Sequence, residues 1–127
     1  MQDRYRFRFW DNKTNKWFHF GFETFPTYEK EIWGALTNGE KIYQCTGLKD
    51  INGKLIYEGD IIKYMYYNPK RYTKWIVVFN QNTLEFDLKG YEHSEYLIRL
   101  TSYSIFNNKV EVVGNIYENL EFLKEDK

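Results

Sequence analysis

The segment Tyr43–Tyr64, which reads YQCTGLKDINGKLIYEGDIIKY, decides the fold class of this chain. It contains strand candidates rich in β-branched and aromatic residues, and the turn signals Asn52-Gly53 and Glu58-Gly59-Asp60 separate them. Asn-Gly between apolar runs is a strong indicator of a tight hairpin turn. The strands expected here are Ile42–Thr46, Leu55–Tyr57 and Ile61–Tyr67. The segment therefore predicts a small antiparallel sheet.

Upstream of this segment, residues 4–10 read RYRFRFW and alternate strictly between charged and aromatic side chains. Alternation with period two is typical of a strand with one buried face. The polar run 11–15 follows, and residues 16–20 are again aromatic. We therefore expect an N-terminal β-hairpin, with arginines on one face of its first strand.

Residues 24–39 interrupt this pattern and predict a short connecting helix. Pro26-Thr27 suits its start, and Asn38-Gly39 suits its end. Tyr28, Ile32 and Leu36 recur at four-residue spacing, so we expect them to form its apolar face.

Downstream, short strand candidates recur between turn residues, as in a β-barrel or β-sandwich. They span residues 72–79, 84–88, 96–106 and 110–116, and residues 119–127 could form one helical turn. We expect two parts, namely the hairpin with its helix (residues 1–40) and a barrel-like body (residues 41–127).

The composition limits the possible function. The chain has 127 residues, 18 basic and 18 acidic residues, and one cysteine, so no disulfide can form within it. Zero formal charge argues against a protein whose main task is to coat nucleic acid. No apolar run of signal or membrane-spanning length occurs, so we expect a cytoplasmic protein. Because aromatic residues make up 20% of the chain, some should lie on a surface where they contact a partner.

Three stretches together resemble the YopX family of small bacteriophage and prophage proteins. They are FRFWD at residues 7–11, QCTGLKD at 44–50 followed by NGK and YEGDI, and EVVGNIYEN at 111–119. The resemblance implies a mainly β fold with an SH3-like antiparallel barrel after the N-terminal hairpin. It implies no activity, cofactor or catalytic residue. Where family members often carry Asn-Pro, this chain has Asn119-Leu120.

The residues that carry this resemblance are also suited to turns. Glycine allows positive φ or a close backbone approach, while asparagine and aspartate bond to nearby backbone. The expected turn residues are Gly47, Asn52, Gly53, Gly59, Asp60 and Gly114.

Little in the sequence points to catalysis. Glu58 and Asp60 flank a glycine, where turn roles are favoured over paired acids. Cys45 could in principle pair with His19 or His93, but no local nucleophile motif supports this. Zinc sites use about four ligands in recognisable spacings, which are lacking here. We expect no enzyme activity, metal or cofactor, and a Cys/His hydrolase is only a remote alternative.

The most interesting candidate surface is the segment 63–75, which reads KYMYYNPKRYTKW. Its basic residues alternate with Tyr64, Tyr66, Tyr67, Tyr72 and Trp75, and it contains no acid. Such a segment could neutralise phosphates and stack bases, or be a soluble hairpin loop. The candidate contact residues are Lys63, Tyr66, Tyr67, Lys70, Arg71, Tyr72 and Lys74.

The arginines Arg4, Arg6 and Arg8 form a second candidate surface. Like charges on one strand face repel unless something opposes them. The opposing group could be acids of the same chain, such as those near the C-terminus, a second copy, or a nucleic-acid backbone. We favour the first two.

Together these observations predict a non-enzymatic phage or prophage accessory protein that acts through protein contacts, either by self-association or by binding a host factor. The alternative is a nucleic-acid-binding module that uses residues 63–75. The sequence indicates no membrane association and no small-molecule substrate.

Overall fold

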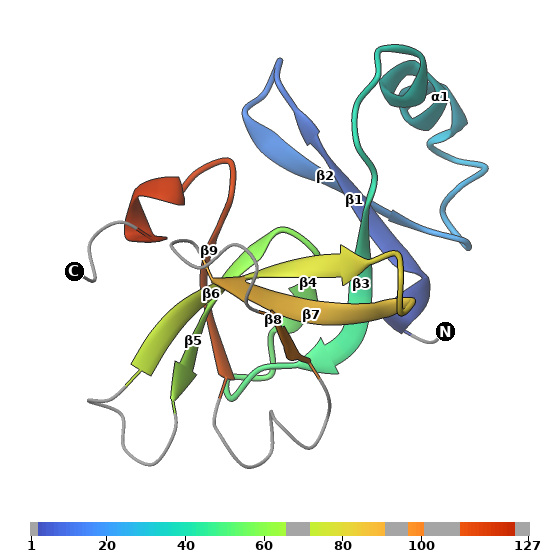
Figure 1. The fold of residues 1–127 in the computed structure, drawn as a ribbon. Helices are drawn as coiled ribbons and strands as arrows, with labels where there is room; N and C mark the ends of the chain where they lie inside the picture. Colours follow the sequence, from blue (N-terminus) through green and yellow to red (C-terminus); the bar gives the residue numbers. More distant parts are fainter. Residues whose placement is uncertain (1–2, 66–71, 91–96, 101–109, 124–127) are drawn as a thin grey trace.

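The computed structural model describes residues 3–65, 72–90, 97–100 and 110–123, which form two antiparallel sheets (Figure 1). The first sheet has the order β2-β1-β3-β4 and the second has the order β8-β7-β6-β5-β9. The first part of the chain contains η1 (Asp3–Tyr5), β1 (Arg6–Asp11), β2 (Lys16–Gly21), α1 (Glu29–Thr37), β3 (Tyr43–Lys49) and β4 (Leu55–Tyr57). The second contains β5 (Asp60–Met65), β6 (Tyr72–Asn80), β7 (Glu85–Gly90), β8 (Leu97–Arg99), β9 (Val110–Asn115) and η2 (Leu120–Leu123). The prediction of a mainly β fold is confirmed.

The predicted N-terminal hairpin is confirmed, with β1 paired to β2 from Arg6↔Gly21 to Asp11↔Lys16. Its first strand begins later than expected, because residues 3–5 form a 3-10 turn. Strand β1 also pairs with β3, so the first sheet continues across the expected division after residue 40. That division into two parts stays a prediction.

The predicted helix is present as α1, but its predicted apolar face is only partly right. Ile32 is buried as expected, whereas Leu36 is exposed and Ala35 is the second buried residue. The reason is that Ile32 and Ala35, three positions apart, face Phe9 and Phe20 of the hairpin. At the predicted stop, Gly39 has a φ of +79° and the Glu40 N–H donates to the Ala35 carbonyl at 2.9 Å, which satisfies the helix end.

The second sheet joins strands that are distant in sequence, because β5 pairs with both β6 and β9. The predicted strands 72–79 and 110–116 correspond to β6 and β9. The strand expected at Leu84 begins one residue later, because Leu84 has a φ of +59° and belongs to the turn. Most of the predicted strand 96–106 lies outside the described residues. The SH3-like character of this part stays a prediction.

Two hydrophobic cores underlie these sheets. The larger lies in the second sheet around Ile62, Val77 and Leu88, and Ile56 of β4 also packs in it. The smaller lies between α1 and the hairpin, around Ile32 and Phe9. Residues from both sheets therefore meet in the larger core, which ties the first sheet to the second.

Substitution by alanine should change the stability of the protein in opposite directions at two glycines. A Cβ at Gly34, inside α1, meets no atom within 4 Å, so Gly34→Ala should stabilise the protein by about 0.5–1 kcal/mol. A Cβ at Gly114 would lie 2.6 Å from the Cβ of Asn119, so Gly114→Ala should destabilise it by about 1–3 kcal/mol. Urea unfolding of both variants measures this, and equal effects would contradict the described packing.

Candidate functional site

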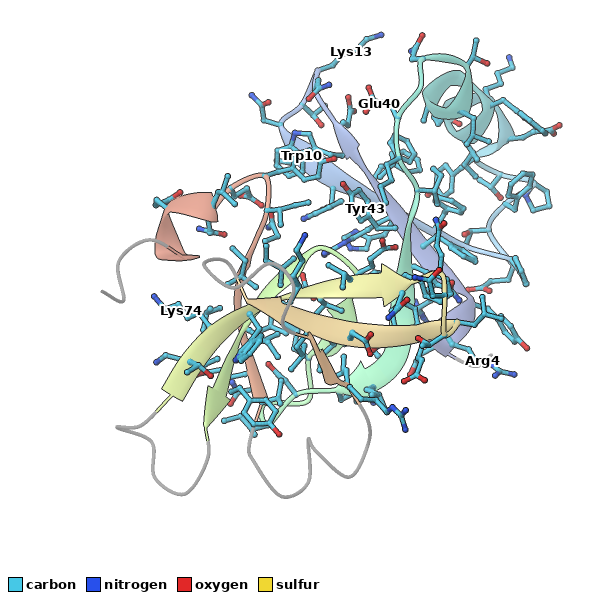
Figure 2. The ribbon with its side chains drawn as sticks, in the orientation of Figure 1. Arg4, Trp10, Lys13, Glu40, Tyr43 and Lys74 are labelled. Carbon is cyan, nitrogen blue, oxygen red and sulfur yellow. The ribbon has the colours of Figure 1, made fainter. Side chains whose placement is uncertain are left out.

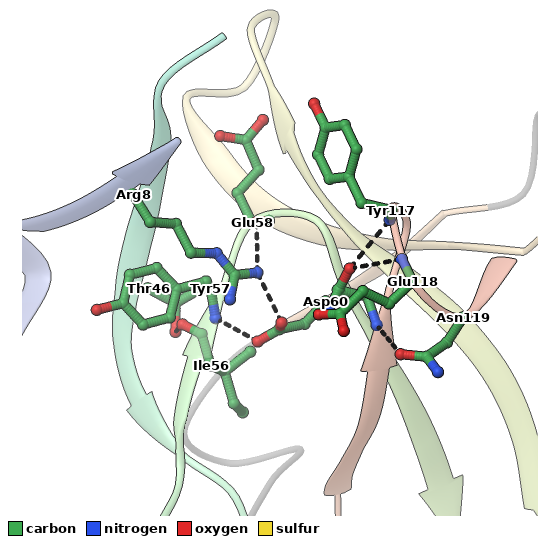
Figure 3. A network of polar contacts seen from close by, with 10 residues as sticks. Arg8, Thr46, Ile56, Tyr57, Glu58, Asp60, Tyr117, Glu118 and Asn119 are labelled. Atoms are coloured by element: carbon green, nitrogen blue, oxygen red, sulfur yellow. Dashed lines mark hydrogen bonds and ion pairs between the residues drawn. The ribbon is translucent and has the colours of Figure 1, made fainter. Parts of the chain in front are cut away.

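Arg8 is the centre of the candidate site. Although it belongs to the expected charged stripe, it is only 5% exposed. Its Nη2 donates to Asp60 Oδ1 at 2.7 Å and to the Glu58 carbonyl at 3.3 Å (Figure 3). Its guanidinium carbon lies 3.7 Å from the ring centroid of Trp17 and 4.5 Å from that of Tyr57. Arg8 therefore sits between two rings and is paired with a buried acid.

Asp60 has two roles at once. Its Oδ2 accepts the Tyr57 backbone N–H at 2.8 Å, which is the turn role expected from sequence. Its Oδ1 pairs with Arg8. Burial raises the pKa of the Asp60 carboxyl, and the Arg8 guanidinium opposes that rise. The buried carboxylate thus depends on Arg8 for compensation of its desolvation.

The predicted arginine stripe does not act as one surface. Arg8 is opposed by an acid of the same chain, as favoured, but that acid is Asp60 rather than one near the C-terminus. Arg6 pairs with Asp3 at 3.2 Å on the exposed surface. Arg4 donates to the Tyr5 hydroxyl at 2.9 Å. Because Arg8 is buried and paired with Asp60, the three arginines do not form one exposed basic surface.

Aromatic rings surround this ion pair and join the hairpin to the rest of the molecule. Trp10 stacks on Tyr117 with centroids 4.9 Å apart, and Trp17 contacts both Tyr43 and Tyr117 edge-on. The hydroxyl groups of Tyr43 and Tyr117 lie 2.7 Å apart. Trp10 and Tyr43 are labelled in Figure 2, where they lie between the hairpin and the second sheet. These rings hold Arg8 in position.

A cleft of about 760 Å³ opens beside this cluster. One wall comes from β1, β2 and β4, and the other from the end of β9 and the turn after it. Its lining residues are Arg8, Trp17, His19, Gly53, Lys54, Leu55, Tyr57, Asp60, Val113, Gly114, Asn115, Glu118 and Asn119. Hydrogen bonds within the second wall fix the turn after β9. The Asn115 side chain accepts the Glu118 N–H and donates to the Glu118 carboxylate, each at 3.0 Å.

His19 and Asp60 thus share one cleft, which sequence reasoning did not anticipate. His19 lies opposite Arg8 in the β1–β2 pairing, and its ring contacts Tyr57 edge-on. Burial lowers the pKa of His19, and the charges of Arg8, Arg6 and Lys54 lower it further. Three cationic side chains therefore act on His19, while the acids Asp60 and Glu118 also line the cleft.

Cys45 has the properties of a core residue. Its side chain is fully buried, and burial raises the pKa of its thiol, which opposes formation of a nucleophilic thiolate. Its sulfur accepts the Gly47 N–H at 3.4 Å. His93, the other suggested partner, lies outside the described residues. Glu58 forms an ion pair with Lys41 at 2.8 Å.

Four of the seven candidate contact residues in the basic-aromatic segment 63–75 lie outside the described residues, namely Tyr66, Tyr67, Lys70 and Arg71. Tyr72 is described only as the first residue of β6. Lys63 and Lys74 lie opposite each other on β5 and β6. Tyr64 and Trp75 are buried in the larger core, so these two rings are not a stacking platform. Arg4 and Lys74 are far apart in Figure 2, so the two basic candidate sites are separate.

Of the expected turn residues, Asn52, Gly53 and Gly59 lie in turns, whereas Gly47, Asp60 and Gly114 lie within β3, β5 and β9. Gly47, Gly53 and Gly59 have positive φ, whereas Gly114 is required by its approach to Asn119. Asn52 donates its backbone N–H to Asp50, whose carboxylate also accepts the N–H groups of Lys54 and Val112. These residues shape the scaffold, and Gly53, Asp60 and Gly114 among them also line the cleft.

Several exposed apolar side chains belong to the segment 22–36, which we call the helix segment. Among the described residues it supplies four of the nine exposed large apolar side chains. They are Phe22 (58% exposed), Trp33 (55%), Leu36 (44%) and Tyr28 (37%). Trp33 and Leu36 are three positions apart, so they lie on one side of α1. Sequence reasoning assigned Tyr28 and Leu36 to the core and did not single out Phe22 or Trp33.

The geometry defines a small, mainly β protein with a polar cleft at the junction of its two sheets. The chain belongs to the YopX protein family, which it matches over residues 6–124. Among solved structures it is similar to the crystal structure of protein EF1440 from Enterococcus faecalis, with 21% identity and a TM-score of 0.58. That alignment covers 93% of this chain and 96% of the other. No curated protein matches the sequence.

No helix among the described residues is long and apolar enough to cross a membrane. Within the same residues, no three or more histidine, cysteine, aspartate or glutamate side chains are grouped so that they could hold a metal ion. The expectation of a protein without metal or cofactor stays a prediction.

Proposed function

We propose that this protein is a non-enzymatic accessory protein of a bacteriophage or prophage, and that it acts in the bacterial cytoplasm through protein–protein contacts. The contact is either self-association or binding of a host protein, made by exposed side chains on an SH3-like scaffold. The observation that carries the proposal is the exposure of Trp33 and Leu36 on one side of α1. Aromatic residues are enriched at interfaces, and clusters of exposed apolar side chains mark interaction sites.

The buried state of Cys45 supports a non-enzymatic role. The one cysteine of the chain lies in the interior with a raised thiol pKa, so it is unsuited to attack a substrate. His19 contacts Tyr57 rather than a nucleophile. These features disfavour the Cys45-His19 hydrolase.

The proposal predicts that Trp33→Ser combined with Leu36→Ser abolishes the contact without unfolding the protein, because both side chains are exposed. Light scattering after size exclusion measures self-association, and capture from a bacterial lysate measures host binding. The control is Leu84→Ser with Leu120→Ser, which removes exposed apolar side chains outside the helix segment. A strictly monomeric protein that captures nothing would contradict the proposal, as would equal loss in both variants.

Nucleic-acid binding is the alternative function. Lys63 and Lys74 lie opposite each other on β5 and β6, close in sequence to the segment 66–71, and these two basic residues favour it. Fluorescence anisotropy with an oligonucleotide separates the two functions. Binding that weakens steeply with salt, and that Lys70→Glu with Arg71→Glu removes, would favour nucleic acid.

A further inference from the structure

We propose that the cleft between the two sheets is a binding site for a small ligand that carries an oxyanion, either a carboxylate or a phosphate. The ligand would accept hydrogen bonds from Trp17 and Arg8. This site is independent of the helix segment and goes beyond the function proposed above. The proposal depends on unpartnered donors, on the positive charge of Lys54, and on the size of the cleft.

Two buried N–H groups of the lining residues have no acceptor. Within the part of the chain that the structure describes, Arg8 Nε and Trp17 Nε1 are buried without a hydrogen-bond partner. A buried donor without a partner costs about 1–3 kcal/mol, so native proteins rarely leave one. Arg8 is more than nine-tenths buried, and its guanidinium lies over the Trp17 ring, so the two groups are neighbours. Both residues line the cleft, so a ligand that enters beside them and shifts their buried side chains slightly would supply the acceptor that the described residues do not.

The charges nearby select an anionic acceptor. Asp60 already balances Arg8, and the Glu118 carboxylate accepts from the Asn115 amide. Lys54 lines the cleft and forms no ion pair with another described residue, and the charge of Arg6 also acts on His19. Charge-assisted hydrogen bonds to carboxylate or phosphate are stronger than neutral ones. The formal charges of the lining residues cancel, so the attraction for an oxyanion is local. It comes from Lys54 and from the unpaired donors at the end of the cleft beside His19.

The size of the cleft indicates a molecule rather than a lone ion. Small-molecule sites commonly measure about 300–1,000 Å³, and this cleft of about 760 Å³ falls within that range. Tyr57 and Leu55 supply apolar surface beside the donors. The ligand would thus combine an oxyanion with a small body that packs on the walls of the cleft.

The test is a titration of the ¹⁵N-labelled full chain with inorganic phosphate, and separately with succinate, followed by NMR. The Trp17 indole N–H resonance should move downfield and saturate, because it gains an acceptor. The indole resonances of Trp10, Trp33 and Trp75 in the same spectrum serve as internal controls. A response to phosphate alone indicates a phosphate-bearing ligand, and a response to succinate alone indicates a carboxylate.

Variants connect that response to the named donors. Trp17→Phe keeps an aromatic ring but removes the N–H, so binding followed at the His19 amide should weaken about 2- to 10-fold. Lys54→Gln should also weaken it, whereas Lys30→Gln, the same change on α1 outside the cleft, should not. An unmoved Trp17 resonance with both probes, an equal response to sodium chloride, or unchanged affinity in Trp17→Phe would each overturn the proposal.

Discussion

Asp60→Ala is expected to lower the free energy of unfolding by about 3–5 kcal/mol, because removing one partner of a buried ion pair leaves the other charge uncompensated. The side chains of Arg8 and Asp60 are only 6% and 3% exposed, so water cannot replace the lost contact. The substitution also removes the acceptor of the Tyr57 N–H. Urea unfolding followed by tryptophan fluorescence measures the loss.

Asp3→Ala is the matched control. It breaks the Arg6–Asp3 ion pair, whose side chains are 46% and 33% exposed, and exposed pairs contribute only about 0–1 kcal/mol. Asp60→Asn is a milder variant, since its amide oxygen can still accept the Tyr57 N–H. An Asp60→Ala protein no less stable than Asp3→Ala would contradict the burial of this pair.

The second large effect is expected in the larger core, where Ile62→Ala should destabilise the protein by about 2–5 kcal/mol. Ile62 is fully buried on β5 between β6 and β9, so truncation leaves a cavity that both neighbours border. The comparison is Ile51→Ala, the same substitution at a side chain that is 48% exposed.

Ile51→Ala should change stability by about 0.5 kcal/mol or less. Both variants are measured in one urea series, with the slope of the transition as a check on two-state behaviour. Comparable losses at the two positions would mean that Ile62 does not lie in a packed core.

Much of the fold could be predicted from local patterns. The alternation of residues 4–10 and the polar run after it identify the β1–β2 hairpin, and Asn38-Gly39 identifies the end of α1. Strand pairing between β5 and β9 could not be predicted, because it joins segments about fifty residues apart and no local pattern encodes it. The apolar face of α1 was misassigned at Leu36, since four-residue spacing does not tell which of two adjacent stripes faces the hairpin.

The cleft was missed for a different reason. The sequence analysis expected Arg4, Arg6 and Arg8 to share one strand face, opposed by acids such as those near the C-terminus or by a second copy, so it did not bring Arg8 and Asp60 together. A contrary pattern was present, because Trp10, Trp17 and His19 share that face of the hairpin and two tryptophans seldom line a solvated surface. What the sequence alone could not supply was the partner Asp60, which reaches Arg8 from the start of β5.

The central claim is that Arg8 faces inward and fastens the hairpin to the second sheet through Asp60. A double-mutant cycle with Arg8→Met, Asp60→Asn and the combined variant tests it most directly. The account predicts that the losses of unfolding free energy in the two single variants do not add up to the loss in the combined variant. The coupling free energy measured by urea unfolding should be about 0.5–3 kcal/mol. Two losses that simply add would show that these side chains act independently, and would contradict the account.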